Sequence, residues 1–172
     1  MAESNAMVSI LMGSDSDLEV MKEAARVLEE FGVAYEIEVT SAHRSPERTR
    51  RIVSEAPARG VRVFIIGAGA AAHLAGVVAA ESTLPVIGVP LDASALHGID
   101  ALYATVQMPA GIPVATMAIG KAGATNAAIF AVEILAVADT GLQSKLQDHK
   151  RQLAEGVERK SASLRERLRA EK

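Results

Sequence analysis

Short apolar segments alternate with helical patterns along most of this chain. Five segments are rich in apolar or β-branched residues and end in turn residues, which is typical of buried strands. They cover residues 8–12, 33–40, 61–67, 85–90 and 113–119. A helical pattern follows each of them; in the first, Leu18, Met21, Ala25 and Leu28 recur at helical spacing. Strict β/α alternation predicts a three-layer, doubly wound α/β domain with a five-stranded parallel sheet.

Two helices and the C-terminal tail differ from this pattern. Helical segments at residues 74–81 and 124–138 have almost no polar face, and a small domain cannot cover such helices alone, so we expect a homo-oligomer. Residues 143–172 carry nine Lys or Arg against five Asp or Glu and a sparse apolar stripe. They predict a helical extension, which either docks on a neighbouring subunit or is solvated. The expected division is a catalytic domain at 7–140 and an extension at 141–172.

Composition narrows the class of protein. The chain has 172 residues, 49% of them hydrophobic, which suits one globular domain. A net charge of −3 gives no case for nucleic-acid binding, and the lack of cysteine excludes disulfides and thiolate metal sites. No apolar run approaches the roughly 18 residues of a membrane span, and MAESNAMVSI lacks the features of a secretory signal. We therefore expect a cytoplasmic protein without a membrane or nucleic-acid partner.

Candidate chemistry lies in the loops after the strands, because open parallel sheets bind ligands beyond the carboxyl ends of their strands. The first loop reads GSDSD, at residues 13–17. Its backbone N–H groups, the hydroxyls of Ser14 and Ser16, and the following helix dipole favour an anion such as phosphate. The carboxylate of Asp17 suits a ribose diol instead. Taken alone, this loop favours a capping role, with Asp17 as the cap of the helix that starts at Leu18.

The second loop reads SAHRSP, at residues 41–46. Arg44 can bind phosphate through two hydrogen bonds, and His43 can give and take a proton near neutral pH. The alternative is that His43 bonds to the backbone and Arg44 is merely exposed. The neighbouring first loop, which suits phosphate, favours a functional role for both residues. Ser45 is expected to cap the next helix, with Pro46 at its first position.

The third loop, residues 67–73, carries almost no side chain before His73. Such a run lets a ligand touch the backbone in a small dry pocket, or serves close packing of a strand against a helix. His73 is either a ligand contact or a helix cap. The histidines lack carboxylate partners at ligand spacing, so we expect no metal.

Five motifs in register resemble the PurE family, the N5-carboxyaminoimidazole ribonucleotide mutases of purine synthesis. They read GSDSD, SAHRSP, IIGAGAAAHLAG, GVP and VQMPAGIPVATMAIGKAGATNAA, and the similarity runs from about Val8 to Asp139. The resemblance implies a flavodoxin-like domain assembled as an octamer, with sites at subunit contacts and no metal or organic cofactor. It implies that a carboxyl group moves from N5 to C4 of an aminoimidazole ribonucleotide.

The resemblance also implies roles for single residues. Ser14 and Arg44 correspond to phosphate contacts, Asp17 to a ribose contact with Ser16 in the same loop, and His43 to the general acid and base. The aminoimidazole base and the carboxylate of the substrate would be lined by Ser41, Ala42, Gly69, Ala70, His73 and Leu74.

Two positions depart from the family's usual GAGGAAHLPG: Ala70 replaces a glycine and Ala75 replaces the proline. An alanine at position 70 is expected to have an ordinary φ. A second branch of the family carboxylates aminoimidazole ribonucleotide with free CO2, usually with a lysine after the histidine and without the AAAHL stretch; Arg44 and His73 favour the mutase branch. A noncatalytic nucleotide-binding module is the remaining alternative, since fold alone does not decide function.

Overall fold

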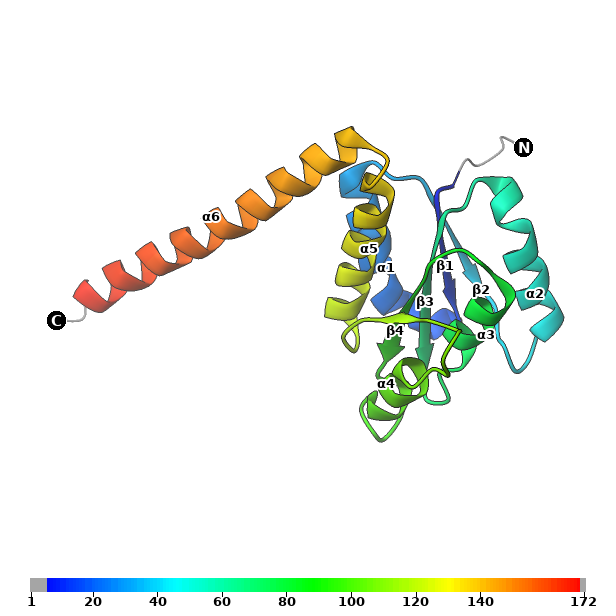
Figure 1. The fold of residues 1–172 in the computed structure, drawn as a ribbon. Helices are drawn as coiled ribbons and strands as arrows, with labels where there is room; N and C mark the ends of the chain where they lie inside the picture. The colour runs from blue at the N-terminus through cyan, green and yellow to red at the C-terminus, as the bar shows by residue number, and fades with distance from the viewer. Residues whose placement is uncertain (1–5, 171–172) are drawn as a thin grey trace. The chain divides into compact units, whose positions relative to one another are not determined.

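Five strands form one parallel sheet in the order β2-β1-β3-β4-β5 (Figure 1). The computed structural model describes residues 6–170. The chain forms two compact units, Met1–Ile134 and Leu135–Lys172, and the sheet lies in the first. The strands are β1 (Val8–Met12), β2 (Tyr35–Val39), β3 (Val63–Gly69), β4 (Val86–Leu91) and β5 (Ala115–Thr116). This strand order is that of flavodoxin-like folds, so the predicted fold class is confirmed.

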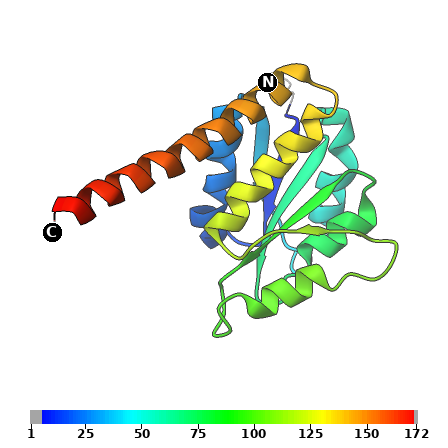
Figure 2. The same cartoon turned by 60° about the vertical axis from the view of Figure 1, so that its left-hand side comes forward.

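Helices cover both faces of this sheet. They are α1 (Leu18–Phe31), α2 (Pro46–Glu55), α3 (Leu74–Glu81), α4 (Ile99–Val106) and α5 (Lys121–Ala136). Helices α1 and α5 lie side by side on one face, and α2 and α3 lie on the other (Figures 1 and 2). Two short 3-10 turns, η1 (Asp15–Asp17) and η2 (Pro57–Arg59), complete the unit. Strands β1 and β4 are buried throughout, which fits sequences that are apolar at every position except Ser9.

The bounds of β2, β3, β4 and β5 all differ from the sequence prediction, most of all at β3 and β5. β3 continues to Gly69, which pairs with Leu91, whereas the sequence predicted a loop from residue 67. β5 is shorter than the predicted residues 113–119, although the amides of Met117 and Gly120 still donate to Gly88 O and Pro90 O, both at 2.9 Å. Because Pro90 has no N–H, it cannot donate a ladder hydrogen bond near the end of β4.

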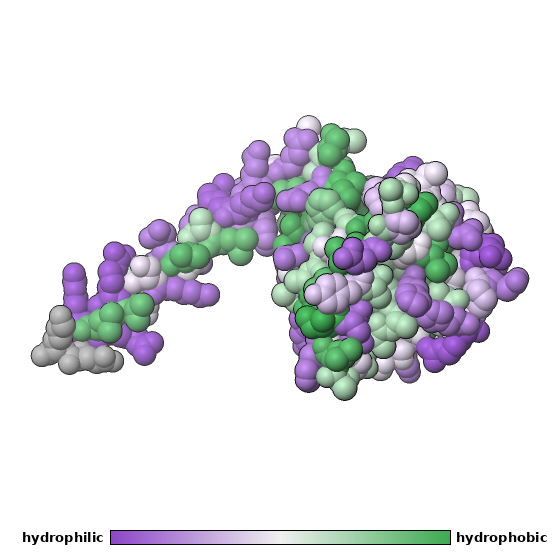
Figure 3. Space-filling model, turned by 60° about the horizontal axis from the view of Figure 1, so that its bottom comes forward, coloured by the Kyte–Doolittle hydropathy of each residue, from purple (hydrophilic) through white to green (hydrophobic). Residues whose placement is uncertain are grey.

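The second unit contains α6 (Thr140–Ala170), the helix predicted for the tail. The carboxylate of Asp139 caps it by accepting from the amides of Gly141 and Leu142 at 2.8 and 3.1 Å. Four apolar side chains, Leu153, Val157, Leu164 and Leu168, are more than half exposed, and Figure 3 shows apolar patches along this otherwise hydrophilic helix. Within residues 6–170 no helix is both long and apolar enough to span a membrane.

Candidate active site

A cavity of about 370 Å³ opens at the carboxyl ends of β1, β2 and β3. The sheet register creates it, because Met12 pairs with both Val39 and Gly67, so the three loops leave the sheet at one level. The lining comprises Gly13, Ser14, Ser16, Asp17, Ser41, Ala42, His43, Arg44, Ala68, Gly69, Ala70, Ala71, Leu74 and Ala93. Every candidate residue from the sequence lies here except His73, which contacts His43 from beside the lining.

The first loop is organised by its own side chains. Ser14 caps η1, its Oγ accepting from the amide of Ser16 at 3.3 Å, while Asp17 Oδ2 accepts from the amide of Ser14 at 3.0 Å. Asp17 makes no side-chain cap to α1, so that expectation was wrong; the carboxylate turns back to Ser14 instead. Burial raises the pKa of Asp17 above its ordinary value, although the amides of Ser14 and Gly13 oppose the shift.

Arg44 connects the second loop to the first. Its Nη2 donates to Gly13 O at 2.8 Å, and its Nε lies 3.5 Å from Ser41 Oγ. The bond to Gly13 O joins the two loops, and the contact with Ser41 lies within the second loop. The guanidinium is a permanent cation beside the backbone amides of the first loop, so this edge of the cavity suits a phosphate or carboxylate.

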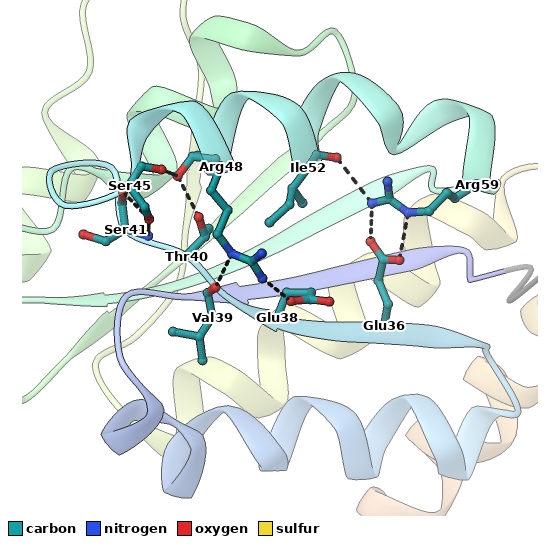
Figure 4. Close-up of polar contacts among 10 residues, drawn as sticks. Glu36, Glu38, Val39, Thr40, Ser41, Ser45, Arg48, Ile52 and Arg59 are labelled. Atoms are coloured by element: carbon teal, nitrogen blue, oxygen red, sulfur yellow. Dashed lines mark hydrogen bonds and ion pairs between the residues drawn. The ribbon is translucent and has the colours of Figure 1, made fainter. Parts of the chain in front are cut away.

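Hydroxyl groups fix the conformation of the second loop (Figure 4). Thr40 and Thr49 are buried, with their Oγ1 atoms 2.8 Å apart. Thr49 Oγ1 donates its only proton to Ser45 O at 3.3 Å, so Thr40 must donate to Thr49. Pro46 takes the first position of α2 as predicted, but Ser45 does not cap that helix; its Oγ bonds to the backbone of Ser41.

Two arginines tie α2 and η2 to the edge strand β2 that carries this loop (Figure 4). Arg48 donates to Val39 O at 3.1 Å and to Glu38 at 2.7 Å. Arg59 makes two hydrogen bonds to Glu36, at 3.1 and 2.7 Å, which raise the pKa of Arg59. Burial alone would raise the pKa of Glu36. The hydrogen bonds to its carboxylate and the positive charge of Arg59 lower the pKa by more, so the pKa of Glu36 falls below its usual value.

The third loop has small side chains partly because larger ones would not fit. A Cβ at Gly67 would lie 2.5 Å from Met21 Sδ, and one at Gly69 would lie 2.4 Å from Ala93 Cβ. Ala70 has a φ of +50°, so the expectation of an ordinary φ was wrong. The chain must turn sharply after the β3 ladder, and Ala70 adopts the left-handed region that the family's usual glycine enters freely.

His73 brings a second imidazole to the cavity. Its Nδ1 lies 2.9 Å from Nε2 of His43, with ring centroids 5.0 Å apart and planes at 83°. His73 occupies the cap position of α3 without a side-chain cap bond, so the capping alternative is not observed. One proton must lie between the two nitrogens for them to bond, so one ring donates and the other accepts.

Sequence reasoning missed four residues that shape this site: Thr40, Arg48, Thr49 and Ala93. The two threonines flank the second loop at a separation of nine residues, a signal that becomes visible only when the strand and helix are placed together. Across residues 6–170, no group of three His, Cys, Asp or Glu side chains could hold a metal ion.

Comparisons with known proteins identify relatives over nearly the whole chain. The family model described as AIR carboxylase matches residues 7–156. N5-carboxyaminoimidazole ribonucleotide mutase of Pyrococcus horikoshii is 51% identical over 96% of this chain and 93% of its own. Phosphoribosylaminoimidazole carboxylase of Candida glabrata is 48% identical over 92% of this chain, which spans 27% of that longer protein. A crystal structure of Treponema denticola PurE has a TM-score of 0.83 and 28% identity, covering 91% of this chain and 97% of its own. The chain belongs to the AIR carboxylase family.

Proposed function

We propose that this chain is a mutase that converts N5-carboxyaminoimidazole ribonucleotide to 4-carboxyaminoimidazole ribonucleotide in purine biosynthesis. The observation that carries the proposal is that His43, Arg44 and Asp17 line one cavity. A proton carrier, a fixed cation and an acceptor for hydroxyl groups are the three chemistries that a ribonucleotide undergoing proton transfer requires. Mutase relatives of matching length, such as the Pyrococcus horikoshii protein, support the same activity.

Binding follows from the two loops at the anionic edge. Arg44 and Ser14 hold the phosphate, with Ser16 in the same loop, and Asp17 accepts from the ribose hydroxyls. The raised pKa of Asp17 does not prevent this, because either carboxyl form retains acceptor oxygens. Ser41, Ala42, Gly69, Ala70, His73 and Leu74 surround the base and its carboxyl group. No metal or organic cofactor takes part.

The reaction exchanges one C–N bond for one C–C bond without redox change. Cleavage of the carbamate releases CO2, and the nitrogen receives a proton from His43. The electron-rich ring then attacks CO2 through C4, and His43 removes the C4 proton to restore aromaticity. The small side chains of the third loop exclude water and keep CO2 beside the ring between these steps.

We propose for this enzyme the assembly and the setting that the resemblance to the mutases implies. The active form is an octamer in the cytoplasm, with residues 7–140 as catalytic domain and 141–172 as helical extension. Exposed apolar side chains on α6 and on α4, such as Tyr103 and Leu168, support burial against neighbouring subunits.

Carboxylation of aminoimidazole ribonucleotide by free CO2 is the second candidate, favoured by the name of the Candida glabrata relative. The two reactions share a product and differ in the source of the carboxyl group. Arg44 and His73, which that branch usually lacks, favour the mutase.

The test supplies the purified protein with N5-carboxyaminoimidazole ribonucleotide, or with aminoimidazole ribonucleotide plus bicarbonate, and follows the C4-carboxylated product. His43→Asn is the control. Conversion of the first substrate at low CO2, lost in the control, supports the mutase. Conversion of only the second at high CO2 supports the carboxylase. Ribonucleotide binding without product from either would overturn both and leave a binding module.

A further inference from the structure

Ala70 holds a backbone conformation that its residue type disfavours. Its φ is +50°, and among residues 6–170 the only other non-glycine residue with a positive φ is His97. In this region the Cβ of an L-residue crowds the following carbonyl oxygen, a strain that glycine escapes. The side chain of Ala70 is an exposed methyl group, so it forms no hydrogen bond that could offset the strain.

The neighbouring residues impose this conformation. Gly69 is the last residue of the β3 ladder and pairs with Leu91, whereas Ala72 is 1% exposed and belongs to the core. Only two residues, Ala70 and Ala71, therefore turn the chain from the carboxyl end of β3 into the interior. The amide of Ala72 donates to Ala70 O at 2.9 Å, and the amide of His73 donates to Ala71 O at 2.8 Å. We call residues 70–73 the third-loop turn.

This turn places His73 against His43. His73 lies between two buried residues, Ala72 and Leu74, so its backbone position is fixed while the turn is closed. In that state Nδ1 of His73 engages Nε2 of His43 at 2.9 Å. A nitrogen engaged with His73 is not available to a substrate, so the closed turn is a resting arrangement for the proposed proton carrier.

We propose that Ala70 is a positioning residue that acts through His73: its left-handed strain allows the third-loop turn to open, so that His73 releases His43 when substrate enters. The inference rests on the proposed mutase function and adds to it a residue that controls access to the proton carrier. Glycine at position 70 would remove the strain and favour the closed turn by about tenfold.

Amide hydrogen exchange measures opening of the turn directly. In Ala70→Gly, the amides of Ala72 and His73 should exchange about tenfold more slowly than in the unchanged protein. The matched control is Ala71→Gly, which adds the same flexible residue next to the strained position. It should leave exchange unchanged or accelerate it, because Ala71 has no positive φ to relieve. Equal or faster exchange in Ala70→Gly would overturn the proposal.

Steady-state kinetics test the functional consequence. Ala70→Gly should lower kcat/KM for N5-carboxyaminoimidazole ribonucleotide severalfold, up to about tenfold, because His73 leaves His43 less readily. A purely structural role for Ala70 predicts the opposite, since the relaxed variant would be more stable and at least as active. The control Ala80→Gly, at an exposed position of α3 outside the cavity, should leave kcat/KM unchanged.

The outcomes separate this inference from the proposed function. Turnover by the unchanged protein with an equally active Ala70→Gly variant would overturn the role of Ala70 and leave the mutase intact. A protein that shows no turnover with N5-carboxyaminoimidazole ribonucleotide would overturn the mutase and, with it, the role assigned to opening. The mutase function and the role of Ala70 are both supported if Ala70→Gly shows slower amide exchange and a lower kcat/KM. Ala80→Gly should show neither change.

Discussion

The hydroxyl oxygens of Thr40 and Thr49 lie 2.8 Å apart in the interior, at the base of the loop that carries His43. Thr40 follows the last residue of the edge strand and Thr49 lies in the first turn of α2, so one hydrogen bond joins the two ends of this loop. The proton of Thr49 reaches Ser45 O, which extends the connection into the loop itself. The position of the proposed proton carrier thus depends on two side chains that do not line the main cavity.

Thr49→Val should destabilise the protein by about 1–3 kcal/mol, because the buried hydroxyl of Thr40 loses its partner, whereas Ser45 O still accepts from the amide of residue 49. Thr40→Val with Thr49→Val should cost less than the sum of the single changes, since no hydroxyl then remains unpaired. Urea unfolding at fixed protein concentration measures both quantities. Thr49→Ser is the control that keeps the hydroxyl, and strictly additive single changes would contradict the pairing.

Asp17→Asn should separate stability from ligand binding. Burial raises the pKa of Asp17 in the folded protein, so the folded state is more stable when Asp17 is protonated. This stabilisation is lost as pH rises through the raised pKa. The neutral amide avoids that loss. The variant should therefore melt above the unchanged protein at pH 7, and the difference should shrink as pH falls below about 4.

Ribonucleotide affinity of Asp17→Asn, measured by calorimetry at pH 7, should fall because the amide offers one acceptor oxygen in place of two. Asp17→Ala is the matched control: it also loses the acceptor for the Ser14 amide and should be less stable than Asp17→Asn at every pH. A melting difference between Asp17→Asn and the unchanged protein that stays constant from about pH 4 to 7 would contradict the raised pKa.

Gly69→Ala should destabilise the protein by about 1–3 kcal/mol, because its Cβ would lie 2.4 Å from that of Ala93. Ala93→Gly in the same chain should restore most of the loss. Gly76→Ala in α3 meets only the flexible end of Met108, at 3.2 Å, and should be neutral or stabilising by up to about 1 kcal/mol. Thermal unfolding of these variants and the unchanged protein checks the contrast, and equal effects of the two glycine substitutions would refute it.

Arg44→Lys should weaken ribonucleotide binding by roughly ten- to a hundredfold, because an ammonium cannot hold Gly13 O and a phosphate with one planar group. KM should rise more than kcat falls, since the interaction is made with the bound ground state as well. Arg48→Lys is a control on α2, outside the cavity lining, and should change KM far less. An unchanged KM in Arg44→Lys would remove Arg44 from the proposed phosphate contacts.

Sequence patterns are enough to predict the layered fold and the edge of the sheet at which the chemistry lies. Alternation of apolar strands with amphipathic helices leaves one economical solution, a parallel sheet covered on both faces, and parallel strands bring the loops after β1, β2 and β3 to one edge. The candidates Ser14, His43 and Arg44 could therefore be found from local composition, and all three line one cavity.

The way these loops are held becomes visible only in the folded chain. The pairing of His43 with His73, and of Thr40 with Thr49, joins residues from different elements whose separation carries no local pattern. The left-handed φ of Ala70 arises because Gly69 is fixed to β4 while Ala72 is fixed in the core. Propensity and periodicity describe neighbours along the chain, whereas hydrogen bonds and backbone strain at a loop depend on what packs across it.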